Sequence, residues 1–342
     1  MRGGHTIMLF RCIISMAIIM YASFAYADTK YRIKETKNTG EIREGYISVP
    51  GGNIWFEIVG ADKKGIPLLV LHGGPGASHD YLETLESLSD ERPVIFYDQL
   101  GSGNSDKPDN KSLWKVKRFV EELHFVRSAL RLGKVHILGQ SWGTMLAVDY
   151  MLTRKPRGVV SLVLSAPCLS ASRFIADQRK YLLEFPEDMQ KIIRDAEASG
   201  NYNSHLYEEA AMKYYRRHVC RLDPWPESME RTLKKSGRPV YEYMWGPSEF
   251  TMTGTLKRYE RAKKLKQIKT PVLFTAGQHD EATPATTRYY QSMLPGSEIA
   301  IFEDASHEHH IEKPEQYLKT VRDFLRRAEK RQILSIRNVV RP

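Results

Sequence analysis

The stretch VHILGQSWGTMLAVDYML, residues 135–152, places a lone serine between two glycines where a strand-like apolar run gives way to a helix-like one. Gly139, Ser141 and Gly143 match the pattern G-x-S-x-G. The pattern alone is short, but a strand before it and a helix after it are the setting in which it forms a sharp, strained turn. Side chains in place of the glycines would clash in so tight a turn. We therefore predict that the turn pushes the Ser141 hydroxyl into the open.

Strand-like and helix-like patterns alternate on both sides of this turn. Residues 45–60 are typical of a hairpin that turns at residues 50–52. Helical patterns occupy residues 117–132, 284–294 and 314–330. The alternation predicts a mostly parallel, doubly wound sheet with helices on its faces. The further strand-like runs are residues 66–74, 92–99, 134–140, 159–167, 271–284 and 297–310.

The alternation is interrupted after residue 167. From residue 170 to residue 255 no strand pattern is clear, and aromatic and charged residues crowd together. We interpret this part as an inserted, mainly helical cap. The predicted units are a segment at 1–27, the first part of the core at 28–168, the cap at 169–258, the second part of the core at 259–330 and a basic tail at 331–342.

The composition is that of a globular protein except at the amino terminus. Hydrophobic residues make up 42% and charged residues 27% of the chain, which excludes a disordered or polytopic membrane protein. Arg2 and Arg11 precede an apolar run that ends in the small-x-small site Ala25–Ala27. This order is typical of a secretory signal peptide cut before Asp28, and it predicts export to the periplasm or the medium. The alternative is an uncleaved amino-terminal anchor.

The chain is basic, with a formal net charge of +10. Removing residues 1–27 takes away two arginines and no acid, so the mature charge is +8. Much of the excess lies in the tail, which either contacts an anionic lipid surface or is a solvated helix end. No nucleic-acid-binding module accompanies the charge, so nucleic-acid binding is not expected. Membrane contact stays open, through the tail or an uncleaved signal.

The sequence contains few cysteines. Cys168 and Cys220 remain after the signal is removed, and they form either one disulfide or a pair of buried free thiols. No C-x-x-C or H-E-x-x-H spacing is present, so we predict neither a metal nor another cofactor.

A serine hydroxyl is a weak nucleophile unless a histidine takes its proton and an acid orients that histidine. Two loops that follow late strands supply these groups, with Asp280 in LFTAGQHDE and His307 in DASHEHH. The carboxyl ends of the strands are where an open α/β sheet builds its site, and the order serine, acid, histidine is that of α/β hydrolases. We interpret the neighbouring His309 and His310 as surface loop residues; they are the alternatives to His307.

The negative oxygen of a tetrahedral intermediate needs backbone N–H donors. The run HGGPG, residues 72–76, directly follows a strand pattern, and its glycines allow the main chain to approach a substrate closely. We predict the amides of Gly74 and Trp142 as these donors. The alternative, a plain Gly-Pro turn, explains Gly76 but not the whole run.

Six motifs, spread from Gly45 to Ala328, resemble those of the prolyl aminopeptidases, also called proline iminopeptidases. They are HGGPGASHDYL, FYDQLGSGNS, GQSWGTMLA, GPSEFTMTGTL, AGQHDEATP and DASHEHHIEKPEQY. The likeness is greatest to the branch that contains the archaeal tricorn-interacting aminopeptidase. The resemblance implies an α/β-hydrolase fold, with a mostly parallel eight-stranded sheet and an inserted helical cap, and the triad proposed above.

The resemblance also implies that acids hold the free amino terminus of the substrate. In this family they fall in the GPSEF and DE motifs, hence Glu249 and Glu281 here. Charge-assisted hydrogen bonds from a partly buried carboxylate pair suit a terminal ammonium. The alternative is that both are surface acids. Aromatic residues of the cap, Tyr214, Tyr215 and Trp225, are expected to limit access to short chains.

The prediction is a serine aminopeptidase that releases an N-terminal residue, preferably proline, from short peptides or amino acid amides. An amidase or esterase of the same fold is the alternative, and a catalytically inactive binding module is a third. The family is commonly cytoplasmic, whereas this chain begins with an export signal. The oligomeric state stays open.

Overall fold

The computed structural model describes residues 32–339, with side chains described as far as Leu334. The predicted signal peptide lies outside the described residues. Nine strands form one sheet in the order β1-β2-β3-β5-β4-β6-β7-β8-β9. The strands are β1 Ile33–Asn38, β2 Ile42–Val49, β3 Gly52–Val59, β4 Leu68–Leu71, β5 Val94–Tyr97, β6 Val135–Gln140, β7 Val159–Ser165, β8 Val272–Gly277 and β9 Glu298–Phe302.

The sheet has one strand more than expected. The additional strand is β1, which pairs antiparallel with β2 at the edge of the sheet. All of its residues are exposed, and its sequence IKETKN lacks the alternation of a half-buried strand. The prediction of eight strands is therefore wrong for the described part of the chain, because an exposed edge strand leaves no hydrophobic signal.

The predicted hairpin and the mostly parallel sheet are both confirmed. β2 and β3 pair antiparallel with Val49 opposite Gly52, which places the turn between them. β3 pairs antiparallel with β5. From β5 through β4, β6, β7 and β8 to β9 every pairing is parallel, so the carboxyl ends of these strands meet at one edge of the sheet.

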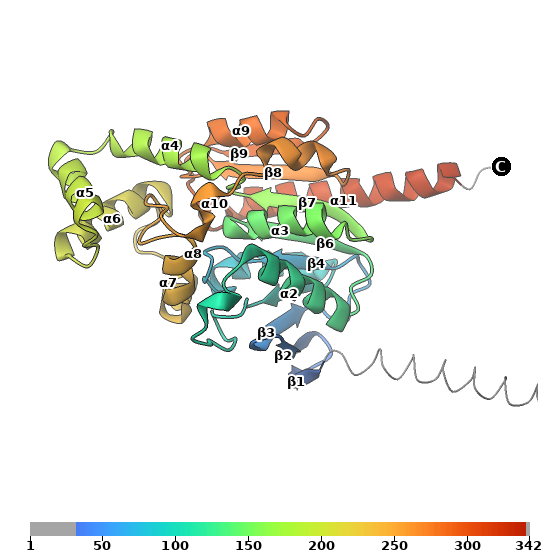
Figure 1. Ribbon diagram of the computed structural model, residues 1–342. Helices are drawn as coiled ribbons and strands as arrows, with labels where there is room; N and C mark the ends of the chain where they lie inside the picture. Colours follow the sequence, from blue (N-terminus) through green and yellow to red (C-terminus); the bar gives the residue numbers. More distant parts are fainter. Residues whose placement is uncertain (1–31, 340–342) are drawn as a thin grey trace, which may run out of the picture.

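Helices cover both faces of the sheet (Figure 1). One face carries α2, α3 and α9, and the other carries the 3-10 helix η1 together with α11. A short helix, α10, directly precedes α11. Their bounds are η1 Asp80–Asp90, α2 Val116–Ala129, α3 Trp142–Arg154, α9 Pro284–Ser292, α10 His309–Glu312 and α11 Pro314–Val339; shorter 3-10 helices are η2 Lys111–Leu113, η3 Thr255–Arg258 and η4 Ala262–Gln267.

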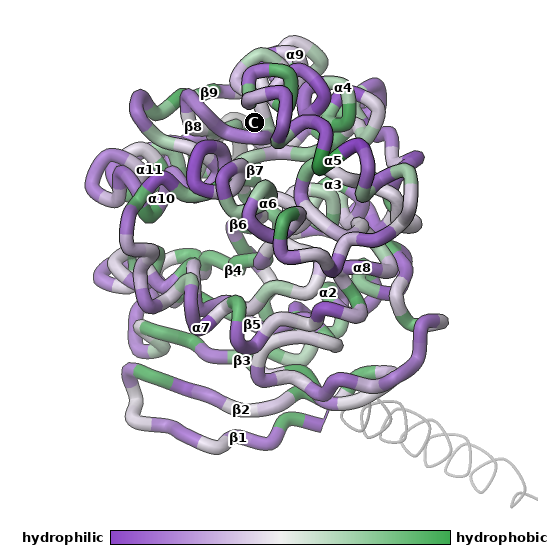
Figure 2. Tube along the Cα trace, turned by 90° about the vertical axis from the view of Figure 1, so that its left-hand side faces the viewer, coloured by the Kyte–Doolittle hydropathy of each residue, from purple (hydrophilic) through white to green (hydrophobic). Residues whose placement is uncertain are grey.

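The central strands are apolar on both sides because each of them packs against both helix layers. In β4, Leu69 and Leu71 join the core cluster that contains α2 and α3, whereas Leu68 and Val70 join the cluster that contains η1 and α11. Successive side chains of a strand point to opposite faces, so an unbroken apolar run is what a doubly covered strand needs. Figure 2 shows this hydrophobic colour along β4.

Between β7 and β8 the chain leaves the sheet and forms helices only. α5 and α6 project furthest from the sheet (Figure 1) and have an apolar cluster of their own, which includes Met189, Ile193 and Tyr207. The insertion that begins near residue 170 is thus helical, as expected. Its helices are α4 Ala171–Leu182, α5 Glu187–Ser199, α6 His205–His218, α7 Glu227–Lys235 and α8 Arg238–Met244.

The basic tail is not a separate segment, because α11 continues through it as far as Val339. Arg327 and Arg331 both pair with Glu298, at 2.6 and 3.3 Å. Part of the basic excess is therefore balanced within the chain. In the part of the chain that the structure describes, none of the helices combines the length and the apolar character needed to cross a membrane.

Cys168 and Cys220 are buried free thiols, which resolves the choice between a disulfide and two thiols. They belong to different core clusters, one on each face of the sheet. Burial raises the pKa of Cys220 to about 12, so this thiol stays protonated at neutral pH.

Candidate active site

Ser141 sits on the turn between β6 and α3 with φ 52° and ψ −119°, a strained conformation for a residue with a side chain. The two flanking glycines are required by close packing. A Cβ on Gly139 would lie 2.3 Å from the Gly143 carbonyl oxygen, and a Cβ on Gly143 would lie 2.2 Å from the Leu71 carbonyl oxygen. The expectation of a strained turn that excludes side chains is confirmed, but Ser141 is buried and faces a pocket rather than the open surface.

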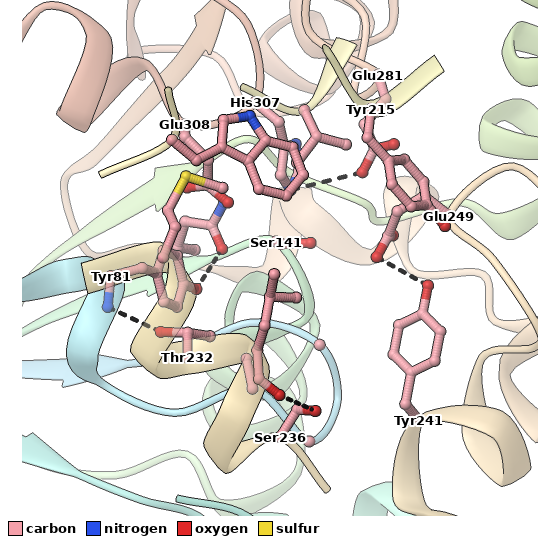
Figure 3. Close-up of a pocket in the computed structure, with 18 of the residues that line it drawn as sticks. Tyr81, Ser141, Tyr215, Thr232, Ser236, Tyr241, Glu249, Glu281, His307 and Glu308 are labelled. Atoms are coloured by element: carbon pink, nitrogen blue, oxygen red, sulfur yellow. Dashed lines mark hydrogen bonds and ion pairs between the residues drawn. The ribbon is translucent and has the colours of Figure 1, made fainter. Parts of the chain in front are cut away.

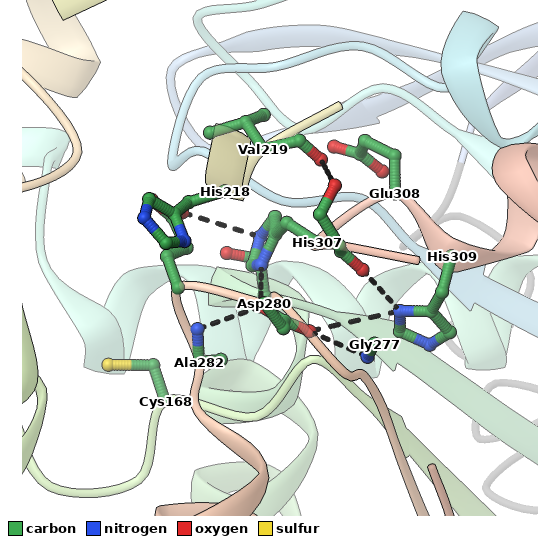
Figure 4. Close-up of polar contacts among 12 residues, drawn as sticks. Cys168, His218, Val219, Gly277, Asp280, Ala282, His307, Glu308 and His309 are labelled. Carbon is green, nitrogen blue, oxygen red and sulfur yellow. Dashed lines mark hydrogen bonds and ion pairs between the residues drawn. The ribbon is translucent and has the colours of Figure 1, made fainter. Parts of the chain in front are cut away.

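His307 and Asp280 meet as predicted. The Nδ1 atom of His307 lies 2.8 Å from Oδ1 of Asp280 (Figure 4). The carboxylate also accepts hydrogen bonds from the backbone N–H groups of Ala282, at 2.7 Å, and Gly277, at 3.3 Å. Because the acid is held in place by its own loop, it orients the imidazole so that Nε2 is left for chemistry.

The interpretation of His309 and His310 as surface residues is wrong, because both are buried. Nε2 of His309 lies 2.9 Å from Oγ1 of Thr275, and Nδ1 lies 3.8 Å from Oδ2 of Asp280. Nε2 of His310 lies 2.9 Å from the Tyr81 carbonyl oxygen. Burial lowers the pKa of His309 to about 3 and that of His310 to about 4, so both are neutral supports of the loop that carries His307.

Ser141 and His307 line one pocket of about 310 Å³. Among residues 32–334, however, the Ser141 hydroxyl makes no side-chain hydrogen bond, and Nε2 of His307 instead faces Oε1 of Glu281 at 3.7 Å. Burial alone would lower the pKa of His307, but the carboxylates of Asp280 and Glu281 outweigh it and raise this pKa to about 10. With a pKa of about 10, the imidazole of His307 is mainly protonated at neutral pH.

Glu249 and Glu281 lie together in the pocket wall, so the alternative that they are surface acids is wrong. Burial raises the pKa of both, and the Glu249 carboxylate raises that of Glu281 further. Two carboxyl groups this close share a proton rather than both ionise. Oε1 of Glu249 accepts a hydrogen bond of 2.8 Å from the Tyr241 hydroxyl (Figure 3), and Oε2 of Glu281 is buried without a partner within the described chain.

The two residues predicted as oxyanion donors, Gly74 and Trp142, lie next to Ser141. Gly74 lines the pocket beside Ser141, and Trp142 is the first residue of α3, where backbone N–H groups have no partner within the helix. Tyr81 connects the two loops, since its hydroxyl accepts from the Gly73 N–H at 2.7 Å and donates to Oε1 of Gln140 at 2.6 Å.

The cap holds the loop that carries two of the acids. Nε2 of Gln178, on α4, donates to the Glu281 carbonyl oxygen at 2.9 Å, and the Tyr181 hydroxyl donates to the Asp280 carbonyl oxygen at 3.2 Å. Tyr214 does not line the pocket but is fully buried in the cap and hydrogen bonded to Gln178. The expectation that Tyr214 limits access is therefore wrong.

Tyr215 and Trp225, the other two aromatic residues expected to limit access, do line the pocket. The pocket therefore has aromatic walls contributed by the cap.

One cluster of potential metal ligands occurs in the described chain, made of His79, Asp80 and Glu83. Cationic side chains already occupy it. Lys235 lies 2.7 Å from Asp80, and Arg231 pairs with both Asp80 and Glu83. These contacts make the cluster an ion-pair network that fastens α7 to η1.

Three residues of the site were not predicted from the sequence: Tyr241, Gln178 and Glu308. Tyr241 and Gln178 reach the acids from the cap, and nothing in their local sequence marks them. Glu308 directly follows His307 in the motif DASHEHH, and an acid next to the expected base was the signal available.

Known proteins resemble this chain over most of its length. A family model for the alpha/beta hydrolase fold matches residues 66–314. Proline iminopeptidase of Heyndrickxia coagulans is 47% identical over 285 residues, which cover 82% of this chain and 98% of that protein.

Solved structures agree with the sequence comparison. The crystal structure of proline iminopeptidase from Mycobacterium smegmatis superposes with a TM-score of 0.78 at 33% identity, over 84% of this chain and 99% of that one. The crystal structure of VinJ superposes with a TM-score of 0.79 at 32% identity, over 83% and 98%. The chain belongs to the proline iminopeptidase family of α/β hydrolases.

Proposed function

We propose that this protein is a serine aminopeptidase that releases an N-terminal residue, preferably proline, from short peptides. The observation that carries the proposal is the carboxyl pair of half-buried Glu249 and buried Glu281 in the same pocket as Ser141 and His307. A buried pair of acids is costly unless a cation offsets it. The free amino terminus of a peptide is such a cation, and it lies one residue from the bond to be cut.

Ser141 Oγ attacks the carbonyl carbon of the terminal residue while Nε2 of His307 takes the hydroxyl proton. The amides of Gly74 and Trp142 donate to the oxyanion that forms. His307 then gives its proton to the leaving amine, and the C–N bond breaks to leave an acyl-enzyme. Water adds to the acyl group with the same histidine as base, which releases the free amino acid and restores Ser141.

The fit of the amino terminus explains why cleavage stops after one residue. A primary ammonium, or the secondary ammonium of an N-terminal proline, gains charge-assisted hydrogen bonds between Glu249 and Glu281, and Oε2 of Glu281 has no other partner in the described chain. A peptide that entered further would place an uncharged amide against the pair and leave the acids unpaired.

The proposal is tested with proline β-naphthylamide, its N-acetyl form and a simple ester such as p-nitrophenyl acetate. We expect rapid hydrolysis of the free form and a loss of at least about a hundredfold in kcat/KM on acetylation, because acetylation removes the charge that offsets the buried pair. Equal rates on free and acetylated substrates would contradict the proposal. Preference for the ester would favour the esterase alternative.

We further propose that the protein is exported after cleavage before Asp28, on the strength of the basic, apolar and small-x-small order at residues 1–27. Its motifs support a place near the tricorn-interacting branch. Amino-terminal sequencing of the protein made by its natural host tests export. A chain that begins at Asp28 outside the cytoplasm is expected, and an intact Met1 in the cytoplasm would contradict it.

A further inference from the structure

A third acid lines the pocket, and the proposed reaction does not use it. Glu308 directly follows His307, and its residue is only 7% exposed. In the described chain neither carboxyl oxygen accepts a hydrogen bond, and Oε2 is fully enclosed. A buried carboxyl group without partners is destabilising unless a ligand supplies what the fold does not.

Glu308 lies on the side of the pocket away from the carboxyl pair. In Figure 3 it is seen beside His307 and Tyr81, and Ser141 lies between it and Glu249. The terminal residue of the substrate takes the Glu249 side. The leaving amine must lie next to His307, which gives it a proton, so the residue after the cut bond extends toward Glu308.

The wall around Glu308 is mostly apolar, and some of the polar atoms buried in it make no hydrogen bond in the described chain. Tyr81, Met229 and Trp225 line the pocket and pack in one core cluster. Nδ1 of His310 lies 3.6 Å from Oε2 of Glu308, and neither atom has a hydrogen-bond partner in the part of the chain described. Burial raises the pKa of Glu308 to about 8, although the neighbouring His307 acts in the opposite direction.

We propose that Glu308, with Tyr81, Met229 and Trp225, forms the subsite for the residue after the cut bond and selects a lysine or arginine there. This inference rests on the proposed aminopeptidase function. The aliphatic stem of such a side chain lies along the apolar wall, and its charged end pairs with the carboxylate. An aspartate or glutamate at this position would place a second carboxyl group against Glu308, which disfavours its binding.

Three dipeptide amides test the subsite: prolyl-lysine amide, prolyl-norleucine amide and prolyl-glutamate amide. Terminal amides remove the carboxylate that would confound the charge, and norleucine matches the stem of lysine without its charge. We expect the wild-type kcat/KM to be at least tenfold higher for the lysine than for the norleucine substrate, and lowest for the glutamate substrate. Released proline is the readout.

Glu308→Gln should reduce the lysine-to-norleucine ratio to within about twofold of one. Because any change in His307 acts on both substrates alike, it cancels in the ratio. Glu187→Gln is the matched control, since it removes the same charge from an exposed acid that pairs with Arg194, and neither of these residues lines the pocket. The control should keep the wild-type ratio.

Equal kcat/KM values for the lysine and norleucine substrates in the wild-type protein would overturn the proposal, whether or not the variant folds. An unchanged ratio in a folded Glu308→Gln variant would overturn it as well. Failure of the proposed function is a different result, in which proline β-naphthylamide and all three dipeptide amides stay uncut.

Discussion

His307 lies beside Asp280 and Glu281, and both carboxylates raise the pKa of its imidazole. Nε2 lies 3.7 Å from Glu281, and the pKa of His307 is raised to about 10. An imidazolium cannot take a proton from Ser141. A substrate cation between Glu249 and Glu281 neutralises the pair, lowers the pKa of His307 and frees it as a base.

The raised pKa predicts the pH dependence of Ser141 reactivity. A fluorophosphonate carries no ammonium, so its rate of reaction reports the basicity of His307 without a substrate cation between Glu249 and Glu281. Because the neutral imidazole is the active form, the rate should rise with pH through neutrality and level off only near pH 10. Glu281→Gln removes a nearby negative charge, so the rise should move down by at least ~1 pH unit.

The measurement is the inactivation rate from pH 6 to 10.5, with Glu187→Gln as the control that should not shift. A midpoint near pH 6.5 in the wild-type protein would show that the carboxylates do not act on His307.

At the scale of residues, the sequence predicted the groups that motifs mark. Ser141 was found from flanking glycines, and Asp280 and His307 from loops after strands. The burial of His309 and of Glu308 was not predictable, because it depends on side chains that approach from distant parts of the chain.

Among the elements, α4 connects the cap to the loop that carries Asp280 and Glu281. Its Gln178 bridges the Tyr214 hydroxyl and the Glu281 carbonyl oxygen, and it is completely buried. The loop that carries Asp280 and Glu281 is therefore held from the cap side as well as by β8.

Gln178→Met keeps most of the side-chain volume but removes both hydrogen bonds. It leaves two buried polar groups unpaired, so we expect the free energy of unfolding to fall by ~2–4 kcal/mol. We also expect kcat/KM for proline β-naphthylamide to fall at least about tenfold, because Glu281 loses its position. Urea unfolding and steady-state kinetics measure the two effects.

Tyr181→Phe is the comparison for this change. It removes the single hydrogen bond to Asp280 at 3.2 Å from a half-buried side chain, so its effects should be smaller on both measures. A Gln178→Met variant with wild-type stability and activity would show that α4 does not hold the loop.

The elements themselves were predictable where burial leaves a periodic pattern. The runs at β4, β6 and β7 are almost fully buried and were recognised. β1 was not, because every residue in it is exposed. The continuation of α11 to Val339 was assigned to a tail, since its charged surface looks the same as that of a solvated segment.

At the scale of the whole molecule, the two cysteines lie in core clusters on opposite faces of the sheet. Cys168 lies in the core cluster that contains α2 and α3, and Cys220 lies in the cluster that contains η1 and α11. Both are buried, and burial raises the pKa of each thiol. The fold is therefore stabilised without a disulfide, whatever compartment the protein occupies.

Titration of thiols with Ellman's reagent checks this arrangement. The chain without residues 1–27 should show almost no reaction at pH 8 when folded and two reactive thiols in denaturant without reductant. Absence of reactive thiols in the unfolded, unreduced protein would reveal a disulfide and contradict the structure.

The shape of the pocket was the part least open to prediction. Tyr215 and Trp225 of the cap line the pocket, whereas Tyr214 is buried elsewhere in the cap. The packing of α6 against α4 and α5 determines which of these side chains reach the pocket. Composition predicts that such a helical insertion exists, but the direction in which each aromatic side chain points follows only from packing.

The central claim is that His307 and Asp280 make Ser141 the nucleophile, and mapping the site of covalent labelling tests it most directly. Folded protein is treated with a fluorophosphonate, digested and analysed by mass spectrometry, alongside Ser141→Ala and His307→Ala. We expect one adduct per chain, on Ser141, no adduct in Ser141→Ala, and labelling slowed by ~10³-fold or more in His307→Ala. An adduct on another residue, or none in protein that still hydrolyses proline β-naphthylamide, would contradict it.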